Sequence, residues 1–319
     1  MTIPTDIADA IFASLKAAKN VLIISHRGPD PDTLGSNLVL RKILEDMGKK
    51  VTSACVDEVP HTYHIVPDIQ TFVTDFNPRD YDLFIAVDAG SISQANFPFK
   101  YPEIVEKNFI NIDHHPSNEG YGTLNLVMDK AASATFVIYH LFQHWNIEIT
   151  PYIATLLLYG LYYDTGSFMH SNTCDAVLEM ASDLLVKGAD QEIIIKSLYQ
   201  NKTINQLRLW GRALESMELT SGNVAVAAVT EDDFKATHAT HNDLSGLIDY
   251  VSSTKGSNFA TLLSSQEDGT IKGSFRTRRD DVNVSALAQN FGGGGHKKAS
   301  GFSIKGKIKR TSQWSIVGE

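Results

Sequence analysis

The chain has 319 residues, of which 43% are hydrophobic and 20% charged. This composition is typical of a globular protein and excludes disordered, collagenous and repeat chains. The 28 basic and 37 acidic side chains give a net charge of −9, which argues against a protein that coats nucleic acid. The length suffices for two domains, each with its own core.

Three features of the sequence bear on the compartment in which the chain works. The longest nearly unbroken apolar stretch, residues 153–163, has 11 residues, whereas a membrane helix needs about 20. Asp6 and Asp9 precede the first basic residue, which is the wrong polarity for a signal peptide. Cys55 and Cys174 stand far apart, as expected of structural thiols in a reducing compartment. We therefore predict a cytoplasmic protein without a membrane partner.

The first half of the chain alternates between helical and strand-like patterns. Apolar residues at helical spacing predict a helix over 5–18, and a second helical pattern runs from Leu34 to Met47 and ends at Gly48. Short apolar runs bounded by polar residues predict strands at Val21 to Ser25, Val51 to Val56, Leu83 to Val87 and Phe109 to Ile112. This alternation predicts an α/β domain with a parallel sheet and helices on both faces.

The second half is helical first and strand-like later. From about Lys130 to Ser221 the pattern is helical, with breaks at Pro151 and Gly188. Strands resume at Val224 to Val229, Phe259 to Ser264 and Thr270 to Arg276. We predict an α/β catalytic domain over residues 1–190, a helical linker over 191–222, and a smaller α+β domain over 223–319 that faces the first domain across a cleft.

Three of the predicted strands each end at an acid or a histidine. These residues are His26, Asp88 and the run Asp113-His114-His115. Because the carboxyl ends of parallel strands line one edge of a sheet, we expect these side chains to converge in space.

Three further carboxylates extend this set. Asp30 and Asp32 lie in the loop after His26, where Pro29 and Pro31 make a helix start unfavourable and leave both acids free to point at one centre. Asp164 ends an otherwise apolar stretch, and a buried carboxylate there needs a cation or a hydrogen-bond donor.

So many carboxylates and imidazoles could not stay ionised together unless cations offset their repulsion. Oxygen-rich sites with a few imidazoles suit manganese, magnesium or iron(II), and they lack the thiolates of many structural zinc sites. A cluster of this size fits a pair of metal ions, which hydrolyse phosphate esters with activated water. Singly, each residue also has a structural interpretation, as a turn former or a packed histidine; the ordered set favours the metal site.

In order and approximate spacing, these residues resemble the four motifs of the DHH phosphoesterase superfamily, which is named after its third motif. Residues 270–302 resemble the DHH-associated C-terminal domain. The motifs that carry this second resemblance are Gly273-Ser274-Phe275-Arg276, Asp281-Val282-Asn283 and the run Gly292 to Gly295 followed by His296. Together the two resemblances span nearly the whole chain.

The resemblance implies two manganese ions that share one carboxylate, with magnesium or cobalt as substitutes. It assigns His26, Asp30 and Asp88 to one ion, and Asp32, Asp88, His114 and Asp164 to the other. The catalytic residues that it implies are His115, Asp88 and Asp113. His115 would face the scissile phosphate as an electrostatic stabiliser or proton donor, and Asp113 would orient a histidine.

The C-terminal motifs predict a surface that binds phosphate. Backbone amides of Gly292, Gly293, Gly294 and Gly295 can approach a phosphate closely, His296 can donate to it, and Arg276 can grip a phosphate bidentately. The alternative is a plain glycine-rich hairpin. Residues 270–310 hold ten basic and two acidic side chains, and Arg278, Arg279, Lys297 and Lys298 either add to the field or form only surface.

Within the superfamily, a two-domain chain of this length resembles the nanoRNase and 3′-phosphoadenosine 5′-phosphate phosphatase branch. The predicted substrates are single-stranded RNAs of two to five nucleotides, linear dinucleotides such as pApA, and the nucleoside bisphosphate. The alternatives are a short-chain exopolyphosphatase or pyrophosphatase, and a nucleotide-binding regulator without turnover. The sequence leaves open the polarity of cutting, activity on cyclic dinucleotides, the metal used in the cell, whether the chain forms a homodimer, and the role of residues 305–319.

Overall fold

The computed structural model describes residues 3–310 and 314–317, so the predicted domain limits at residues 1 and 319 lie outside the described residues. Contacts divide the chain into two compact units, Met1–Asn201 and Lys202–Glu319. This division falls inside the region predicted as a linker. Helix α8 (Gln191–Tyr199) therefore packs with the first unit and helix α9 (Ile204–Glu215) with the second.

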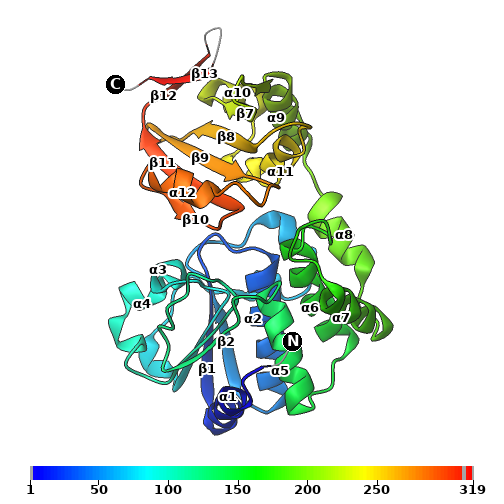
Figure 1. Cartoon of the computed structure of the whole chain (residues 1–319). Coiled ribbons are helices and arrows are strands. Elements are labelled where there is room, and N and C mark those ends of the chain that lie inside the picture. The colour runs from blue at the N-terminus through cyan, green and yellow to red at the C-terminus, as the bar shows by residue number, and fades with distance from the viewer. Residues whose placement is uncertain (1–2, 311–313, 318–319) are drawn as a thin grey trace. The chain divides into compact units, whose positions relative to one another are not determined.

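A five-stranded parallel sheet forms the centre of the first unit (Figure 1). Its strands are β1 (Asn20–Ser25), β2 (Lys50–Ala54), β3 (Leu83–Val87), β4 (Phe109–Asp113) and β5 (Leu124–Val127), in the order β2-β1-β3-β4-β5. The first four were predicted, but β5 was not, because its four residues include a polar side chain and are only partly buried. The strand order reverses between β1 and β3, and open α/β sheets bind ligands at such a switch point.

Helices cover both faces of this sheet, as predicted. One face carries the longer helices, α1 (Thr5–Ala17), α2 (Pro31–Asp46), α5 (Ala134–Trp145) and α6 (Pro151–Asp164), with α7 (Asp175–Val186) packed on α6. The other face carries α3 (Ile92–Ala95), α4 (Phe97–Lys100) and the 3-10 turn Pro102–Ile104. Further 3-10 turns are His61–Tyr63, Ile69–Thr71 and Pro78–Asp80. In β1, Val21 and Ile23 face the longer helices while Leu22 and Ile24 face the shorter ones.

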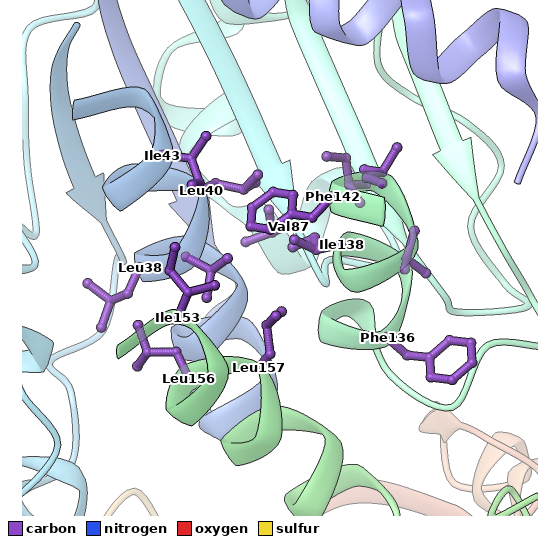
Figure 2. Packing of buried hydrophobic residues seen from close by; sticks show 14 of the residues in the cluster. Leu38, Leu40, Ile43, Val87, Phe136, Ile138, Phe142, Ile153, Leu156 and Leu157 are labelled. Atoms are coloured by element: carbon purple, nitrogen blue, oxygen red, sulfur yellow. The ribbon is translucent and has the colours of Figure 1, made fainter. Parts of the chain in front are cut away.

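The main core lies where α2, α5 and α6 meet the sheet. Figure 2 shows Leu38 and Ile43 of α2, Leu156 and Leu157 of α6, and Phe142 of α5 gathered there. Helices α2 and α6 approach each other very closely at Gly35, where an added Cβ would lie 2.6 Å from the backbone oxygen of Leu156. Since α2 carries Asp32 in its first turn and α6 ends at Asp164, this core holds two candidate site residues in fixed positions.

The prediction that the two prolines disfavour a helix start after His26 was wrong. Helix α2 begins at Pro31 rather than near Leu34, and Asp30 is its N-cap, accepting hydrogen bonds from the backbone N–H groups of Asp32 and Thr33. The first helical position needs no N–H partner and suits the fixed φ of proline, so Pro31 begins the helix instead of preventing it. Asp32 is consequently held by helical backbone and not by a free loop.

The second unit is built on a six-stranded mixed sheet with the order β10-β11-β9-β8-β7-β6. Its strands are β6 (Glu218–Leu219), β7 (Val224–Val229), β8 (Phe259–Ser265), β9 (Thr270–Arg276), β10 (Gly294–Gly295) and β11 (Ala299–Lys305). Only β7 and β8 pair in parallel. The predicted strands β7, β8 and β9 are present, whereas β11 was missed because small residues, Ala299, Gly301 and Ser303, occupy one of its faces.

Helices cover this second sheet unequally. Helices α9, α10 (Glu231–Thr237) and α11 (Leu247–Ser252), with the turn His241–Leu244, bury one face of β7 and β8. Helix α12 (Val284–Gln289) packs on the other face against Phe275 and Phe302. A two-stranded ribbon of β12 (Lys307–Arg310) and β13 (Trp314–Val317) follows. Among the helices that the structure describes, none is long and apolar enough to cross a membrane.

Candidate functional site

The side chains predicted to converge do lie together at the carboxyl edge of the parallel sheet. His26 follows β1, Asp88 follows β3 and His114 follows β4. One set that could hold a metal ion is His26, Asp30 and Asp88, and a second is Asp32, His114 and Asp164. Within each set the ligand atoms lie no more than 4.8 Å apart.

Asp88 stands between the two sets. Its Oδ2 lies 3.5 Å from Nε2 of His26, and its Oδ1 lies 3.3 Å from Nε2 of His114. The backbone of Asp88 is left-handed, with φ of 56°. Residues other than glycine adopt this conformation at some cost, and aspartate tolerates it better than most. This turn at the end of β3 places the carboxylate between both histidines, so each oxygen faces a different set.

Both histidines present Nε2 to the carboxylates because their other ring nitrogen is occupied. Nδ1 of His26 lies 2.8 Å from the carbonyl oxygen of Arg27, and Nδ1 of His114 lies 3.2 Å from that of Ala131. A carbonyl accepts only from a protonated nitrogen, which fixes the proton on Nδ1 and leaves Nε2 to coordinate. Nε2 of His114 also lies 3.2 Å from Oδ2 of Asp164.

Asp32 is fully buried and firmly held. Its carboxylate accepts hydrogen bonds from the backbone N–H groups of Ala134 and Thr135, at 2.6 and 3.0 Å, and from the Thr135 hydroxyl at 2.7 Å. These two amides begin helix α5, so the negative charge also lies at the positive end of that helix. Gly160 of α6 lies directly against it, since an added Cβ would be 2.4 Å from Oδ1 of Asp32.

A hydrogen-bonded network lies behind His115. Nδ1 of His115 is 2.7 Å from Oδ1 of Asp113, which is fully buried at the end of β4. The other oxygen of Asp113 accepts from Asn118 at 2.6 Å, and Asn118 in turn bonds to Asn111. Asp113 therefore contacts the histidine next to Asp88 and is itself fixed by an amide network.

The electrostatics of the cluster favour bound cations or protons. Burial raises the pKa of Asp32 well above its usual range, and the carboxylates of Asp88 and Asp164 add to this. Burial lowers the pKa of His26 and of His114, but neighbouring carboxylates outweigh it and the pKa of each rises well above its usual value. For Asp88, burial is outweighed by the two imidazoles, which hold its pKa well below its usual range.

The donor set fits divalent metal ions. Oδ1 of Asp88 is buried, and apart from Nε2 of His114 at 3.3 Å, which bonds to it only when that nitrogen is protonated, it has no hydrogen-bond donor among the described residues. Such an unsatisfied buried carboxylate oxygen is costly unless a cation neutralises it. Carboxylates with one imidazole in each set suit hard or borderline divalent ions.

Sequence reasoning missed several residues that support the cluster. Thr135 and Asn118 hold Asp32 and Asp113, and Asn172 donates to the carbonyls of both Asp164 and Ala132. The sequence marked only some of them. Asn111 is a lone amide in an apolar strand and Gly160 interrupts an apolar helix, but nothing local distinguished Asn118 or Asn172.

In the second unit, two of the predicted phosphate-binding residues, Arg276 and Gly294, lie on one face of the mixed sheet. Arg276 of β9 pairs with Ala299 of β11, and Gly294 of β10 pairs with Gly301 of β11. Directly paired residues of antiparallel strands share a face, and positions two apart do too, so Arg276 and Gly294 lie on the same face. Nε of Arg276 makes an ion pair of 3.1 Å with Asp249 of α11.

The four glycines of the loop differ in what the fold requires of them. An added Cβ at Gly293 would lie 2.1 Å from the backbone oxygen of Gly301, and one at Gly295 would lie 2.6 Å from that of Ala299. Gly292 has a left-handed φ of 72°. Gly294 has neither constraint, because it is exposed and a Cβ there would face open space. The protein itself therefore gives no reason for glycine at position 294.

Known proteins match this chain over most of its length. The DHH family, N-terminal domain, matches residues 20–161, and the DHHA1 domain matches residues 221–313. The bifunctional oligoribonuclease and PAP phosphatase NrnA of Thermus thermophilus is 32% identical over 296 residues, which span 92% of this chain and 86% of that protein. The protein of the same name from Bacillus subtilis is 26% identical, with 92% of each chain covered.

The fold also matches a solved structure. A crystal structure of an exopolyphosphatase-related protein from Bacteroides fragilis has a TM-score of 0.89 and 23% identity, covering 96% of this chain and 93% of the other. With the carboxylate and histidine cluster, these matches define a metal-dependent phosphoesterase. The chain belongs to the DHH family.

Divalent metal binding should strengthen as the pH rises. The pKa of His26 and of His114 is raised in the metal-free cluster, so both imidazoles hold protons that a metal ion must displace. Those protons stabilise the metal-free fold below the unfolded-state histidine pKa, and this stability is lost as the pH rises through the folded-state values. We expect the rise in melting temperature on adding Mn²⁺ to be larger at pH 8.5 than at pH 6.5. An equal rise at both values would contradict the proton displacement.

Proposed function

We propose that this chain is a manganese-dependent hydrolase of RNAs of two to five nucleotides, of linear dinucleotides such as pApA, and of 3′-phosphoadenosine 5′-phosphate. The observation that carries the proposal is the pair of ligand sets that meet at Asp88. The names of the two relatives, bifunctional oligoribonuclease and PAP phosphatase, support this substrate class. A pair of divalent ions would supply neutralisation of the phosphate charge and activation of water for in-line attack.

In this proposal, His26, Asp30 and Asp88 hold one ion, and Asp32, Asp88, His114 and Asp164 hold the other. His115 donates a proton to the leaving oxygen or stabilises its charge. Burial lowers the pKa of His115, but its hydrogen bond to Asp113 and the nearby Asp88 raise it above the usual value, which favours the protonated imidazole that a proton donor requires. Asp113 keeps the ring oriented through Nδ1.

The second unit would hold the part of the substrate that is not cut. Arg276 supplies a charged fork, and the backbone of Gly294, exposed and without a side chain, lets a phosphate reach the amides of the loop. Placing one grip and one cutting centre on different units suits a short substrate. The predicted cleft between them stays a prediction.

A hydrolysis panel tests the function directly. Phosphate or nucleotide release is measured with manganese and with magnesium, from pApA, a three-nucleotide RNA, 3′-phosphoadenosine 5′-phosphate, cyclic di-AMP and tripolyphosphate. AMP release from pApA or the RNA, with little attack on tripolyphosphate, is the expected result. Release chiefly from tripolyphosphate would contradict the proposal and favour an exopolyphosphatase. If no substrate is hydrolysed, the remaining alternative is a nucleotide-binding regulator.

The glycines of the loop give a matched pair of variants. We expect Gly294→Ala to fold with an unchanged melting temperature, since its Cβ meets nothing, but to raise KM for pApA about tenfold by obstructing the phosphate. Gly293→Ala should instead lose about 2 kcal/mol or more of unfolding free energy, because its Cβ overlaps a backbone oxygen. Calorimetry and steady-state kinetics separate the two effects. Unchanged kinetics in Gly294→Ala would show that the glycine loop does not bind the substrate.

A further inference from the structure

One face of the outer strands β9, β11 and β10 in the second unit, here called the open face, carries small side chains. Cations lie beside them. Gly294 of β10, Gly301 of β11 and Ser274 of β9 form a row across three strands. All three have little or no side chain, and none is fully buried. In the same face Arg276 lies beside Ala299 in the next row. Beyond Arg276 the sequence continues with two more arginines, Arg278 and Arg279.

The alternation between buried and exposed side chains along β9 continues past the last residue of the strand. Ile271, Gly273, Phe275 and Thr277 are buried in turn, whereas Lys272 and Arg278 are exposed. The hydroxyl of Thr277 donates to the carbonyl of Asn258 at 2.7 Å, which holds that side chain inward. With a period of two, Arg278 therefore lies on the open face that carries Arg276.

A second exposed cation, Lys297, lies in the turn that precedes the partner strand at this end of β9. The backbone N–H of Thr277 donates to the carbonyl of Lys298 at 2.9 Å, and this pair continues the register in which Arg276 faces Ala299. Lys297 is the neighbour of Lys298 in the sequence, and its carbonyl accepts from the backbone N–H of Val284 at 2.9 Å. Lys297 is exposed at the tip of the tight turn between β10 and β11, next to His296.

The four cations beyond Arg276 fall into two kinds. Arg279 makes a two-pronged ion pair with Asp281, at 2.9 and 2.6 Å, and Lys298 makes one of 2.8 Å with Asp280. Arg278 and Lys297 make no ion pair with any carboxylate in the described part of the chain. Two positive charges are thus offset where they stand, and two are available to an anion.

We propose that Arg278 and Lys297 form a second phosphate subsite, beyond Arg276, that holds the third phosphate of an oligonucleotide. The inference rests on the proposed function. A linear dinucleotide such as pApA has two phosphates, one for the metal centre and one for Arg276 with the glycine loop. A strand of three or more nucleotides carries a third phosphate, and this third phosphate is the one that we assign to Arg278 and Lys297. The pair therefore sets how strongly the protein prefers RNAs of three to five nucleotides over dinucleotides.

The test compares two double variants that each remove two positive charges. Arg278→Gln with Lys297→Gln removes the unpaired cations, and Arg279→Gln with Lys298→Gln, the control, removes the paired ones. Hydrolysis of pApA and of five-nucleotide oligoadenylate is measured in manganese. Binding of the fluorescein-labelled five-nucleotide strand is measured by anisotropy in EDTA at several salt concentrations.

The first variant should lose about tenfold in kcat/KM and in affinity for the five-nucleotide strand, while its kcat/KM for pApA stays within twofold of the parent. The slope of log affinity against log salt concentration should become less steep by about 0.7 for each phosphate that the variant no longer neutralises. The control should keep the parent's length preference. Equal losses on both substrates, or the same loss in the control, would overturn the subsite. If the parent hydrolyses neither substrate, the proposed function fails, yet the anisotropy arm still decides the subsite.

Discussion

Asp88→Asn is expected to abolish hydrolysis, lowering kcat/KM by at least about a thousandfold, and to remove the stabilisation by Mn²⁺. The two oxygens of Asp88 face the two ligand sets, at 3.3 Å from His114 and 3.5 Å from His26. An amide has one oxygen and no charge, so it cannot serve both sets. Asparagine also tolerates the left-handed backbone at this position, whereas alanine would add strain to the loss of the ligand.

The readouts for this variant are activity, the Mn²⁺-induced change in melting temperature, and circular dichroism. Asp75→Asn is the matched control, because Asp75 is an exposed carboxylate whose ion pair with Lys100 lies at the surface. The control should keep both the activity and the response to Mn²⁺. A folded Asp88→Asn protein that retains the Mn²⁺ response would show that Asp88 is not shared between two ions.

Gly160→Ala is expected to lower both the stability of the first unit and the activity. Its Cβ would lie 2.4 Å from Oδ1 of Asp32 and 2.6 Å from the Thr135 side chain. Asp32 cannot move aside, because three hydrogen bonds from Ala134 and Thr135 hold it. We expect a loss of about 3 kcal/mol of unfolding free energy and at least about a hundredfold loss of activity, since a buried ligand is displaced.

Gly211→Ala is the control for this substitution. Gly211 also lies inside a helix, α9, but it is exposed and an added Cβ meets nothing within 4 Å. Alanine there should raise the unfolding free energy by about 0.5–1 kcal/mol, because it reduces the entropy of the unfolded chain. Urea unfolding should show a lower unfolding free energy for Gly160→Ala and a higher one for Gly211→Ala. A Gly160→Ala protein as stable and active as the parent would mean that α6 does not press on Asp32.

The cluster of metal-ligand candidates could largely be predicted from the sequence because its members occupy positions with a simple geometric meaning. His26, Asp88 and His114 follow buried apolar runs, and the ends of parallel strands share an edge. The N-terminus of α2 was predicted wrongly, because proline breaks a helix in its interior but suits the first turn. Asn118 and Asn172 could not be predicted, since each acts through contacts between segments distant in the sequence.

By itself, the sequence determined the α/β class, the alternating strands of the first unit, the acids and histidines at the strand ends and the glycine-rich loop. Each of these is a local pattern, with a period, a boundary or a motif that adjacent residues define. Only the tertiary structure decided that Asp88 stands between His26 and His114, that Gly160 lies against Asp32, and that Arg278 and Lys297, unlike Arg279 and Lys298, form no ion pair within the described residues. Those facts depend on which distant segments pack together, and packing is a property of the whole folded chain.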